Sequence, residues 1–219
     1  MLNFEILRDN CIEHWYKYTH HEFVETLRLG TLPKANFQHY LCQDYVFLME
    51  YSKAWAYAIY KAKSIEEMEF AYKGVQGLLS GEIDLHLSYC DDWNISKQQV
   101  FDTVVHPNNT AYTSYVLRCG EKGSYIDMMS ALAPCAIGYA EIGARIVADT
   151  SSNQTDNPYQ SWMNVYGGDD FIQGAIDFKA FLEKIYTGIS DSEVVRQKEI
   201  FKKATQLEIG FWDMGIEKQ

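Results

Sequence analysis

Apolar residues recur at spacings of three and four along most of the chain, a pattern typical of amphipathic helices. Hairpin signals are rare: the 219 residues include only four prolines, and no Asn-Gly or Asp-Gly pair stands between alternating segments. The pattern therefore predicts an all-α protein.

Helix-start and helix-stop signals divide this pattern into segments. Gly30 ends one helix, and Pro33 stands in the first turn of the next. Segments 64–67 and 96–99 both have the Ser-x-x-Glu/Gln form of a capping box. The stretch Thr150–Pro158 is the one clear polar linker. We expect helices at residues 4–18, 20–29, 34–63, 64–90, from 96, 112–119, 124–149, up to about 166, 169–186, and from 190 onward.

Length and cysteine usage favour one domain over residues 1–219, long enough to bury a core without disulfides. The five cysteines are odd in number and scattered, and no secretion signal precedes them, so we expect free thiols in a reducing cytoplasm. The apolar stretch Met128–Ala140 is shorter than the roughly 20 residues that cross a bilayer. A membrane partner is not expected.

Charge excludes another class of partner. The formal net charge of -11 and a pI near 4.9 repel phosphate backbones, and the sequence has no Lys/Arg stripe, so nucleic acid is not an expected partner. The 16 tyrosines suggest a pocket for a flat polar ligand, although filling the core accounts for most of them.

Two carboxylates lie on otherwise apolar helix faces. Asp44 shares a face with Phe47, Leu48, Tyr51 and Trp55, and Glu208 shares one with Ala204, Phe211 and Gly215. Burial beside aromatics favours the protonated form of a carboxyl group unless it is hydrogen bonded, and such a group can hold or donate a proton. The alternative for Asp44 is an ion pair with a lysine or arginine of a neighbouring helix.

Cys135 is the candidate nucleophile, in the segment Ala131-Leu-Ala-Pro-Cys-Ala-Ile-Gly-Tyr139. Small neighbours such as Gly138 are expected to leave space above its sulfur, so that the thiol faces a cavity. The other cysteines are expected to act as small apolar residues.

Several motifs together resemble the thiaminase II (TenA) family over almost the whole chain and in the family's order. They are His21–Val24, Gly30–Pro33, Tyr40–Tyr45, Ser80–His86, Ala131–Cys135, Tyr139 and Glu208–Met214. The resemblance implies a haem-oxygenase-like helical fold, a homotetramer and no cofactor. It also implies hydrolysis of 4-amino-5-aminomethyl-2-methylpyrimidine, and less efficiently of thiamine, to 4-amino-5-hydroxymethyl-2-methylpyrimidine in thiamine salvage.

The resemblance also assigns roles. Cys135 matches the nucleophile and Glu208 the general acid that protonates a ring nitrogen. Asp44 matches the acceptor of hydrogen bonds from the 4-amino group. Tyr139 and Tyr166 match phenols that contact the substrate.

Three aromatic positions complete the implied site. Tyr112 and Phe211 are expected to stack on the ring. Phe47 stands where the family often has a tyrosine that is hydrogen bonded to the catalytic thiol. A phenyl ring donates no such bond, so we expect slower turnover with the same reaction type.

Alternatives to this assignment depend on histidines. Glu82 and His86 lie one turn apart and could ligate a metal, but a structural hydrogen bond between helices is the preferred interpretation. His14, His20 and His21 could be considered as haem ligands, because the resembled fold also includes haem oxygenases. Surface or capping roles are favoured for them. No metal site is predicted.

Two other functions remain open for this fold. One is a non-catalytic pyrimidine-binding or regulatory protein, against which the acidic charge and the absence of a DNA-reading helix argue. The other is a quinone-cofactor oxidase, which depends on a pocket rich in histidine and arginine, whereas the matched positions here are Cys, Glu and Tyr.

Overall fold

A computed structural model of the chain describes residues 2–149 and 156–217, and within these ranges it contains helices and no strands. The all-α prediction is therefore confirmed. The described residues form two compact units. The first extends up to Leu32 and from Ser130 to Ile216, and the second extends from Pro33 to Met129 and includes Glu217. The single domain expected over residues 1–219 stays a prediction.

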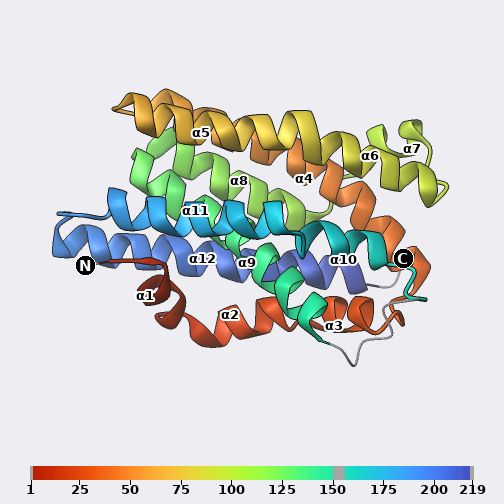
Figure 1. Cartoon of the computed structure of the whole chain (residues 1–219). Coiled ribbons are helices and arrows are strands. Elements are labelled where there is room, and N and C mark those ends of the chain that lie inside the picture. Colours follow the sequence, from red (N-terminus) through yellow and green to blue (C-terminus); the bar gives the residue numbers. More distant parts are fainter. Residues whose placement is uncertain (1, 150–155, 218–219) are drawn as a thin grey trace. The chain divides into compact units, whose positions relative to one another are not determined.

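The first unit contains the long C-terminal helix α12 (Asp191–Ile216). It lies beside three short helices (Figure 1), namely α1 (Phe4–Asp9), α2 (Ile12–Thr19) and α3 (Glu22–Arg28). Two further helices of this unit contact each other, α10 (Gln160–Tyr166) and α11 (Asp169–Ile185). Most of α9 (Tyr125–Ala148) also belongs to this unit. Its core is aromatic, since the fully buried rings of Trp15, Trp162 and Trp212 lie in it.

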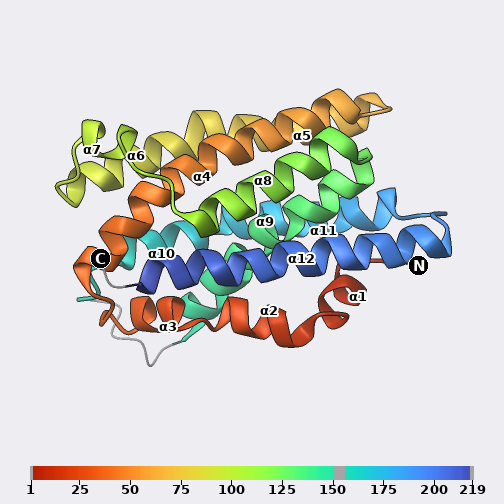
Figure 2. The ribbon, with the colours of Figure 1, turned by 180° about the vertical axis from the view of Figure 1, so that it is seen from behind.

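The second unit is organised by its longest helix, α4 (Lys34–Lys61). Four other helices of the unit pack on it, and Figure 2 shows this group from behind: α5 (Ile65–Gly77), α6 (Ile83–Asp92), α7 (Lys97–Phe101) and α8 (Pro107–Lys122). The buried side of α4 carries the aromatic stripe that its sequence predicts, because Asp44, Phe47 and Tyr51 are all less than 5% exposed.

Capping residues set most helix starts as predicted. Ser96 and Gln99 form a complete capping box at α7, and Ser190 and Glu193 bond each other's backbone N–H groups at the start of α12. At α5 only half of the box forms. The Ser64 hydroxyl accepts a hydrogen bond from the backbone N–H of Glu67. The Glu67 carboxylate, however, accepts its hydrogen bond from the backbone N–H of Lys63.

The N-terminal segment differs from the expected pair of helices. A single helix was expected over residues 4–18, but it is divided in two because Cys11 leaves helical geometry, with φ -135° and ψ 35°. Leu7 accepts a hydrogen bond from the Cys11 thiol at 3.6 Å, which tucks this side chain back onto α1. An interruption by one cysteine has no signal in the hydrophobic pattern, which continues through it.

The segment expected as one helix over residues 64–90 is continuous but not uniform. Between α5 and α6 it passes through a π-helical segment, Leu78–Glu82. A π segment inserts extra backbone into a helix and shifts the face that follows, and such segments are frequent at functional sites. His86 lies on α6, just beyond this segment.

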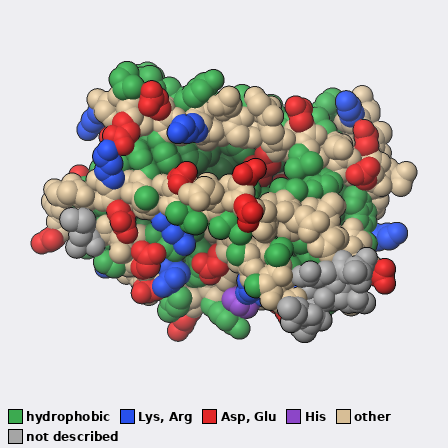
Figure 3. Space-filling view, in the orientation of Figure 1, with side chains coloured by type: hydrophobic (Ala, Val, Ile, Leu, Met, Phe, Trp, Pro, Cys, Tyr) green, Lys and Arg blue, Asp and Glu red, His purple; other side chains and the backbone are tan. Residues whose placement is uncertain are grey.

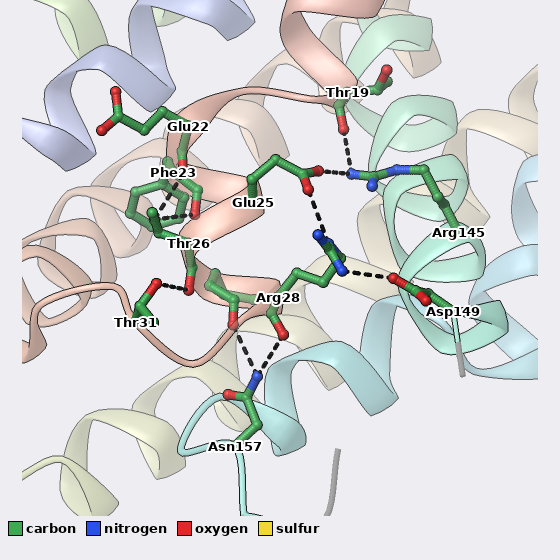
Figure 4. Close-up of polar contacts among 11 residues, drawn as sticks. Thr19, Glu22, Phe23, Glu25, Thr26, Arg28, Thr31, Arg145, Asp149 and Asn157 are labelled. Atoms are coloured by element: carbon green, nitrogen blue, oxygen red, sulfur yellow. Dashed lines mark hydrogen bonds and ion pairs between the residues drawn. The ribbon is translucent and has the colours of Figure 1, made fainter. Parts of the chain in front are cut away.

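An ion-pair network ties α3 to α9 within the first unit (Figure 4). The Glu25 carboxylate lies 2.9 Å from Arg28 and 2.7 Å from Arg145, and Arg28 also lies 2.6 Å from Asp149. The polar segment Thr150–Pro158 lies mostly outside the described residues, but the Asn157 side chain donates to two backbone carbonyls at the end of α3, those of Leu27 and Arg28.

The Glu25 pair predicts a pH-dependent contribution to stability. Burial alone would raise the pKa of Glu25, but Arg28 and Arg145 overcome this effect and lower the pKa below its ordinary value of 4.5. A lowered pKa in the folded state stabilises the protein above pH 4.5, and this stabilisation is lost as pH falls through the lowered pKa.

We therefore expect Glu25→Gln to lower the melting temperature at pH 7 by about 2–4 °C, which corresponds to about 1 kcal/mol for a partly exposed charged pair. The gap should narrow on acidification through the lowered pKa. The matched control is Glu22→Gln, an exposed residue of the same helix, which should leave the melting temperature unchanged. A Glu25→Gln gap that stays constant on acidification would contradict the assignment.

The helix α9 is the one described helix that is long and apolar enough to cross a membrane, yet 61% of its most apolar window is buried inside the protein. The apolar stretch Met128–Ala140 is the central part of this helix, whose bounds agree with the expected range 124–149. Burial of this kind is typical of the core helix of a soluble protein.

Candidate active site

Cys135 lies in the middle of α9, directly after Pro134. The proline has no backbone N–H, so the helix loses the hydrogen bond that would reach back to the Ser130 carbonyl. The Tyr18 hydroxyl donates to the Pro134 carbonyl at 3.3 Å. The Cys135 side chain is neither fully buried nor fully exposed, whereas Cys11 and Cys90 are buried. Intermediate exposure is the setting that a reacting thiol requires.

The space expected beside Gly138 is not a hollow. A Cβ atom at Gly138 would lie 2.2 Å from Cε1 of Tyr18, so this ring already fills the room that the glycine leaves. The expectation that Gly138 leaves open space above the sulfur is therefore wrong. Its role is to let Tyr18 pack against α9.

Tyr139, one turn after Cys135, is the centre of an aromatic cluster. Its ring centroid lies 5.0 Å from Tyr166, 5.2 Å from Trp212 and 6.1 Å from Trp162. Tyr139 and Tyr166 are each 5% exposed. Two of the predicted substrate-contacting phenols are thus neighbours in the first unit, held by aromatic packing on both sides.

Tyr166 reaches this position because α9 and α10 approach backbone to backbone. A Cβ atom at Gly143 would lie 2.1 Å from the Tyr166 carbonyl carbon, a separation that real Cβ atoms do not show. Gly143 stands one turn after Tyr139 on α9, so this close approach brings the end of α10 and its Tyr166 ring next to Tyr139.

We expect Gly143→Ala to lower the free energy of unfolding by at least about 2 kcal/mol, because the added methyl group must push the α10 backbone away. Thermal melting should show a decrease of several degrees. Gly174→Ala in α11 is the matched control: nothing lies within 4 Å of its Cβ position, so its melting temperature should stay equal or rise. Equal melting temperatures for Gly143→Ala and the wild type would contradict the close approach.

Glu208 lies on the buried side of α12 and is only 1% exposed, as its apolar neighbours predict. It follows Gln197 by eleven residues, which is about three helical turns, so the two side chains share one face. Gln197 accepts a hydrogen bond from the Ser130 hydroxyl of α9 at 2.8 Å. The Glu208 face of α12 is therefore the face that α9 contacts.

A second contact between α9 and α12 fixes their direction. Ser130 and Gln197 meet near the start of this contact, and Tyr139 and Trp212 meet further along both helices. The two stretches thus run the same way. Trp212 stands one turn after Glu208 on α12, and Tyr139 stands one turn after Cys135 on α9. The predicted nucleophile and the predicted acid therefore each lie between the two contacts along their helices.

Phe211 lies beside Trp212 at the end of this stretch and is 1% exposed. Further along, Asp213 lies 3.1 Å from His21, which caps α3 through Nδ1. Burial lowers the pKa of His21, while the Asp213 hydrogen bond opposes this change. His21 therefore has the capping role preferred from the sequence. His20 likewise ends α2 as its C-cap.

The second unit contains the predicted amine-binding acid. Asp44 is 3% exposed, and the hydroxyl of Tyr40, one turn before it, donates to its Oδ2 at 3.2 Å. His86 of α6 places Nδ1 3.4 Å from the same oxygen and donates from Nε2 to the Leu41 carbonyl. His86 thus makes the hydrogen bond between helices that was preferred over a metal site. The described residues contain no group of three or more His, Cys, Asp or Glu side chains that could hold a metal ion.

Phe47 and Tyr112 form an aromatic contact in this unit. Phe47 lies one turn after Asp44 on α4, and its centroid lies 5.1 Å from that of Tyr112 on α8 and 5.2 Å from that of Tyr51. Tyr112 is fully buried and Phe47 is 3% exposed. The residues predicted for the site therefore form two groups, Asp44 with Phe47 and Tyr112, and Cys135 with Tyr139, Tyr166, Glu208 and Phe211.

The sequence did not identify several residues that support these two groups. Tyr18, Trp162 and Trp212 surround Tyr139, while Tyr40 and His86 hold Asp44. For Tyr40 the spacing of one turn from Asp44 was a usable signal. For the others, contact depends on elements far apart in the chain, and no local pattern indicates it.

Comparison with known structures identifies the type of fold. A domain of Shewanella denitrificans with a haem oxygenase-like fold superposes with a TM-score of 0.77 at 13% identity, covering 97% of this chain and 91% of that one. A TenA family transcription regulator of a Silicibacter species superposes with a TM-score of 0.92 at 40% identity, covering 97% and 95%. The fold is therefore the all-helical, haem-oxygenase-like type that the resemblance implied.

The sequence comparisons identify the family. The model of the TENA/THI-4/PQQC family matches residues 8–218, so the chain belongs to that family. An uncharacterized protein of Haemophilus influenzae is 43% identical over 204 residues, 93% of this chain and 94% of that protein. An aminopyrimidine aminohydrolase of Halalkalibacterium halodurans is 30% identical over 206 residues, 94% of this chain and 91% of that protein.

Proposed function

We propose that the protein is an aminopyrimidine aminohydrolase of thiamine salvage. It would convert 4-amino-5-aminomethyl-2-methylpyrimidine and water to 4-amino-5-hydroxymethyl-2-methylpyrimidine and ammonia, and would act less efficiently on thiamine. The observation that carries this proposal is that α9, with the partly exposed Cys135, and α12, with the buried Glu208, run side by side in the same direction, with each of these residues between the same two contacts. The name of the Halalkalibacterium relative supports the same reaction class.

The addition step of the proposed reaction has a residue for each of its two roles. The Cys135 thiolate adds to an electron-poor ring carbon while Glu208 protonates a ring nitrogen, so that the ring acquires no full negative charge. The exocyclic C–N bond then breaks, and the amine takes up a proton and leaves as ammonia. Water adds to the exocyclic methylene, and the thiolate leaves the ring as the aromatic system is restored.

Substrate orientation is assigned to the remaining residues. Asp44 would accept the hydrogen bond of the 4-amino group, while Tyr139 and Tyr166 would contact the substrate and Phe211 would stack on it. Phe47 and Tyr112, whose rings pack against each other, would provide a second stacking surface. No cofactor is required by this scheme, because the electron-poor pyrimidine itself accepts the electron pair during thiolate addition.

The direct test follows ammonia release from the aminomethylpyrimidine by the purified chain, with thiamine as the second substrate. Release above the uncatalysed rate, together with formation of the hydroxymethyl product, is the expected result. A chain that releases no ammonia from either substrate would contradict the proposed function. The variants that divide the activity among residues are considered in the Discussion.

A second candidate function is pyrimidine binding without catalysis, in a regulatory protein. What favours it is the name of the Silicibacter structure, a TenA family transcription regulator. The net charge of -11 argues against direct contact with nucleic acid, and on the face in Figure 3 Lys and Arg side chains are scattered among Asp and Glu. Tight binding of the hydroxymethylpyrimidine with no turnover of the amine would favour this candidate.

We also propose a cytoplasmic location and a homotetramer, both of which rest on the sequence and the family resemblance. Five cysteines that form no disulfide in the described part of the chain suit a reducing compartment. The mass of the assembly in solution, measured by light scattering, tests the oligomeric state: four times the 25.3 kDa chain is expected.

Phe47 offers a test of the chemistry around the thiol. We expect Phe47→Tyr to raise kcat by roughly fivefold, since one added hydrogen bond to the thiolate is worth about 1 kcal/mol. Ammonia release at saturating substrate measures the effect. The control is Phe101→Tyr, a substitution at an exposed ring of α7, which should leave kcat unchanged. A kcat for Phe47→Tyr equal to or below that of the wild type would contradict the expectation that a tyrosine at this position donates a hydrogen bond to the thiolate.

A further inference from the structure

His86 is the buried titratable residue that the proposed chemistry does not use. It is 4% exposed and lies on α6, directly after the π-helical segment. Both of its ring nitrogens have defined neighbours. Nε2 lies 2.5 Å from the Leu41 carbonyl oxygen, and Nδ1 lies 3.4 Å from Oδ2 of Asp44. The imidazole thus connects the backbone of α4 to the acid assigned to substrate recognition.

The tautomer follows from the partner at Nε2. A carbonyl oxygen only accepts hydrogen bonds, so the proton of the neutral ring must stand on Nε2. Burial lowers the pKa of His86 to about 4, against the opposing effect of the Leu41 hydrogen bond, so the isolated ring is neutral at pH 7. Nδ1 then presents a lone pair toward the Asp44 oxygen.

Two acceptors at this separation repel each other unless a proton lies between them. A carboxyl group and an imidazole that interact so closely titrate as one pair, and the proton belongs to the pair rather than to either residue. Two neighbouring titratable groups of the same unit, the Cys90 thiol and the Tyr40 hydroxyl, keep their own protons. Burial, with Cys42 and Asp44 adding to it, raises the pKa of the Cys90 thiol to about 12, and the Tyr40 hydroxyl already donates to Oδ2.

We propose that His86 is a positioning residue that determines specificity: together with Asp44 it holds one proton between Nδ1 and Oδ2, and Oδ1 of Asp44 therefore meets the substrate as a hydrogen-bond acceptor only. An acceptor at this point selects a ring with an amino group at position 4 over a ring with an oxo group there. The inference rests on the proposed function, because Asp44 must contact the 4-position of the pyrimidine.

The selection has a physical basis in unpaired buried groups. A 4-amino group donates to Oδ1, whereas a 4-oxo group would place a second acceptor against it in a buried setting. Sites built to pair with a particular polar group discriminate strongly against an analogue that leaves the group unpaired. Without His86, Asp44 could carry its own proton toward the substrate and pair with an oxo group as a donor.

The first experiment compares dissociation constants for 4-amino-5-hydroxymethyl-2-methylpyrimidine and its 4-oxo analogue. His86→Gln is the informative variant, since its amide can still donate to the Leu41 carbonyl but offers nothing equivalent to Nδ1. The matched control is Gln38→Leu, which removes another hydrogen bond between α4 and the end of α6, the 2.9 Å bond from Gln38 to the Trp93 carbonyl.

The preference for the amino ring should be the same in the wild type and in Gln38→Leu, and at least tenfold smaller in His86→Gln. A purely structural role of His86 would weaken binding of both rings alike and leave the ratio unchanged, which would overturn the inference. If the wild type binds neither ring, the proposed function fails, and the proton-sharing claim is decided by the second experiment.

The second experiment needs no ligand and no His86 variant. Nitrogen-15 NMR of the histidine-labelled chain should show Nε2 of His86 as the proton-bearing nitrogen. The Nδ1 signal should lie further toward the protonated value in the wild type than in Asp44→Asn, whose amide donates an ordinary hydrogen bond. Identical Nδ1 signals in the two proteins would overturn the shared proton.

Discussion

Cys135→Ser is expected to reduce ammonia release from the aminomethylpyrimidine by at least about 1,000-fold, because the serine hydroxyl is not ionised at neutral pH and the covalent route is lost. The substitution changes one atom, and the site is partly exposed, so the fold should survive it. Binding of the hydroxymethylpyrimidine product should therefore be retained within a few-fold. A loss of turnover with retained binding would locate the defect in the chemistry.

The control for this experiment is Cys119→Ser, at another cysteine of intermediate exposure, on α8. Its ammonia release should equal that of the wild type. Equal release by Cys135→Ser and the wild type would end the nucleophile hypothesis. If both proteins released ammonia only at the uncatalysed rate, the second candidate function, pyrimidine binding without catalysis, would remain.

Glu208→Gln is expected to lower kcat by about 10²–10⁴-fold, the range that a positioned general acid contributes. Glutamine keeps the volume of the buried side chain and can still form hydrogen bonds, but it cannot protonate a ring nitrogen. KM should change little, since the amide still occupies the same place. The measurement is the steady-state rate of ammonia release at saturating substrate.

The matched control is Glu199→Gln, which changes an exposed carboxylate of the same helix, α12. This variant should retain the wild-type kcat. A Glu208→Gln protein with wild-type kcat and KM would contradict the role of Glu208 as general acid. A rise in KM alone would assign Glu208 to binding rather than to proton transfer.

Periodicity and capping were sufficient to predict most of the fold. Ser96 and Ser190 begin helices where the sequence indicated, because a capping interaction involves residues three apart and is visible locally. The same reasoning predicted burial of Asp44 and Glu208, since a helical stripe of apolar neighbours fixes the face on which each lies.

The features that the sequence missed depend on contacts between distant segments. Gly138 was expected to open a cavity, but a glycine on a helix leaves room that any neighbour can occupy, and here Tyr18 does so. The break at Cys11 and the π segment Leu78–Glu82 likewise leave the apolar spacing intact. His86 was weighed only as a metal ligand or a structural residue, because nothing in the chain indicates that it reaches Asp44.

The candidate site itself was predicted in two different ways. The spacing of apolar residues indicated which acids are buried, whereas the roles of Cys135 and Glu208 came from the family resemblance. The structure adds that α9 and α12 run side by side in the same direction, with these two residues between a pair of contacts. It also adds that Phe47 and Tyr112 pack together near Asp44.

The central claim is that the Cys135 thiol and the Glu208 carboxyl act on one bound aminopyrimidine. A crystal structure of the chain with bound 4-amino-5-hydroxymethyl-2-methylpyrimidine tests it most directly. We expect the ring to place a ring nitrogen on Glu208 and a ring carbon next to the sulfur. A bound ring that lies apart from Cys135 or from Glu208 would contradict the account.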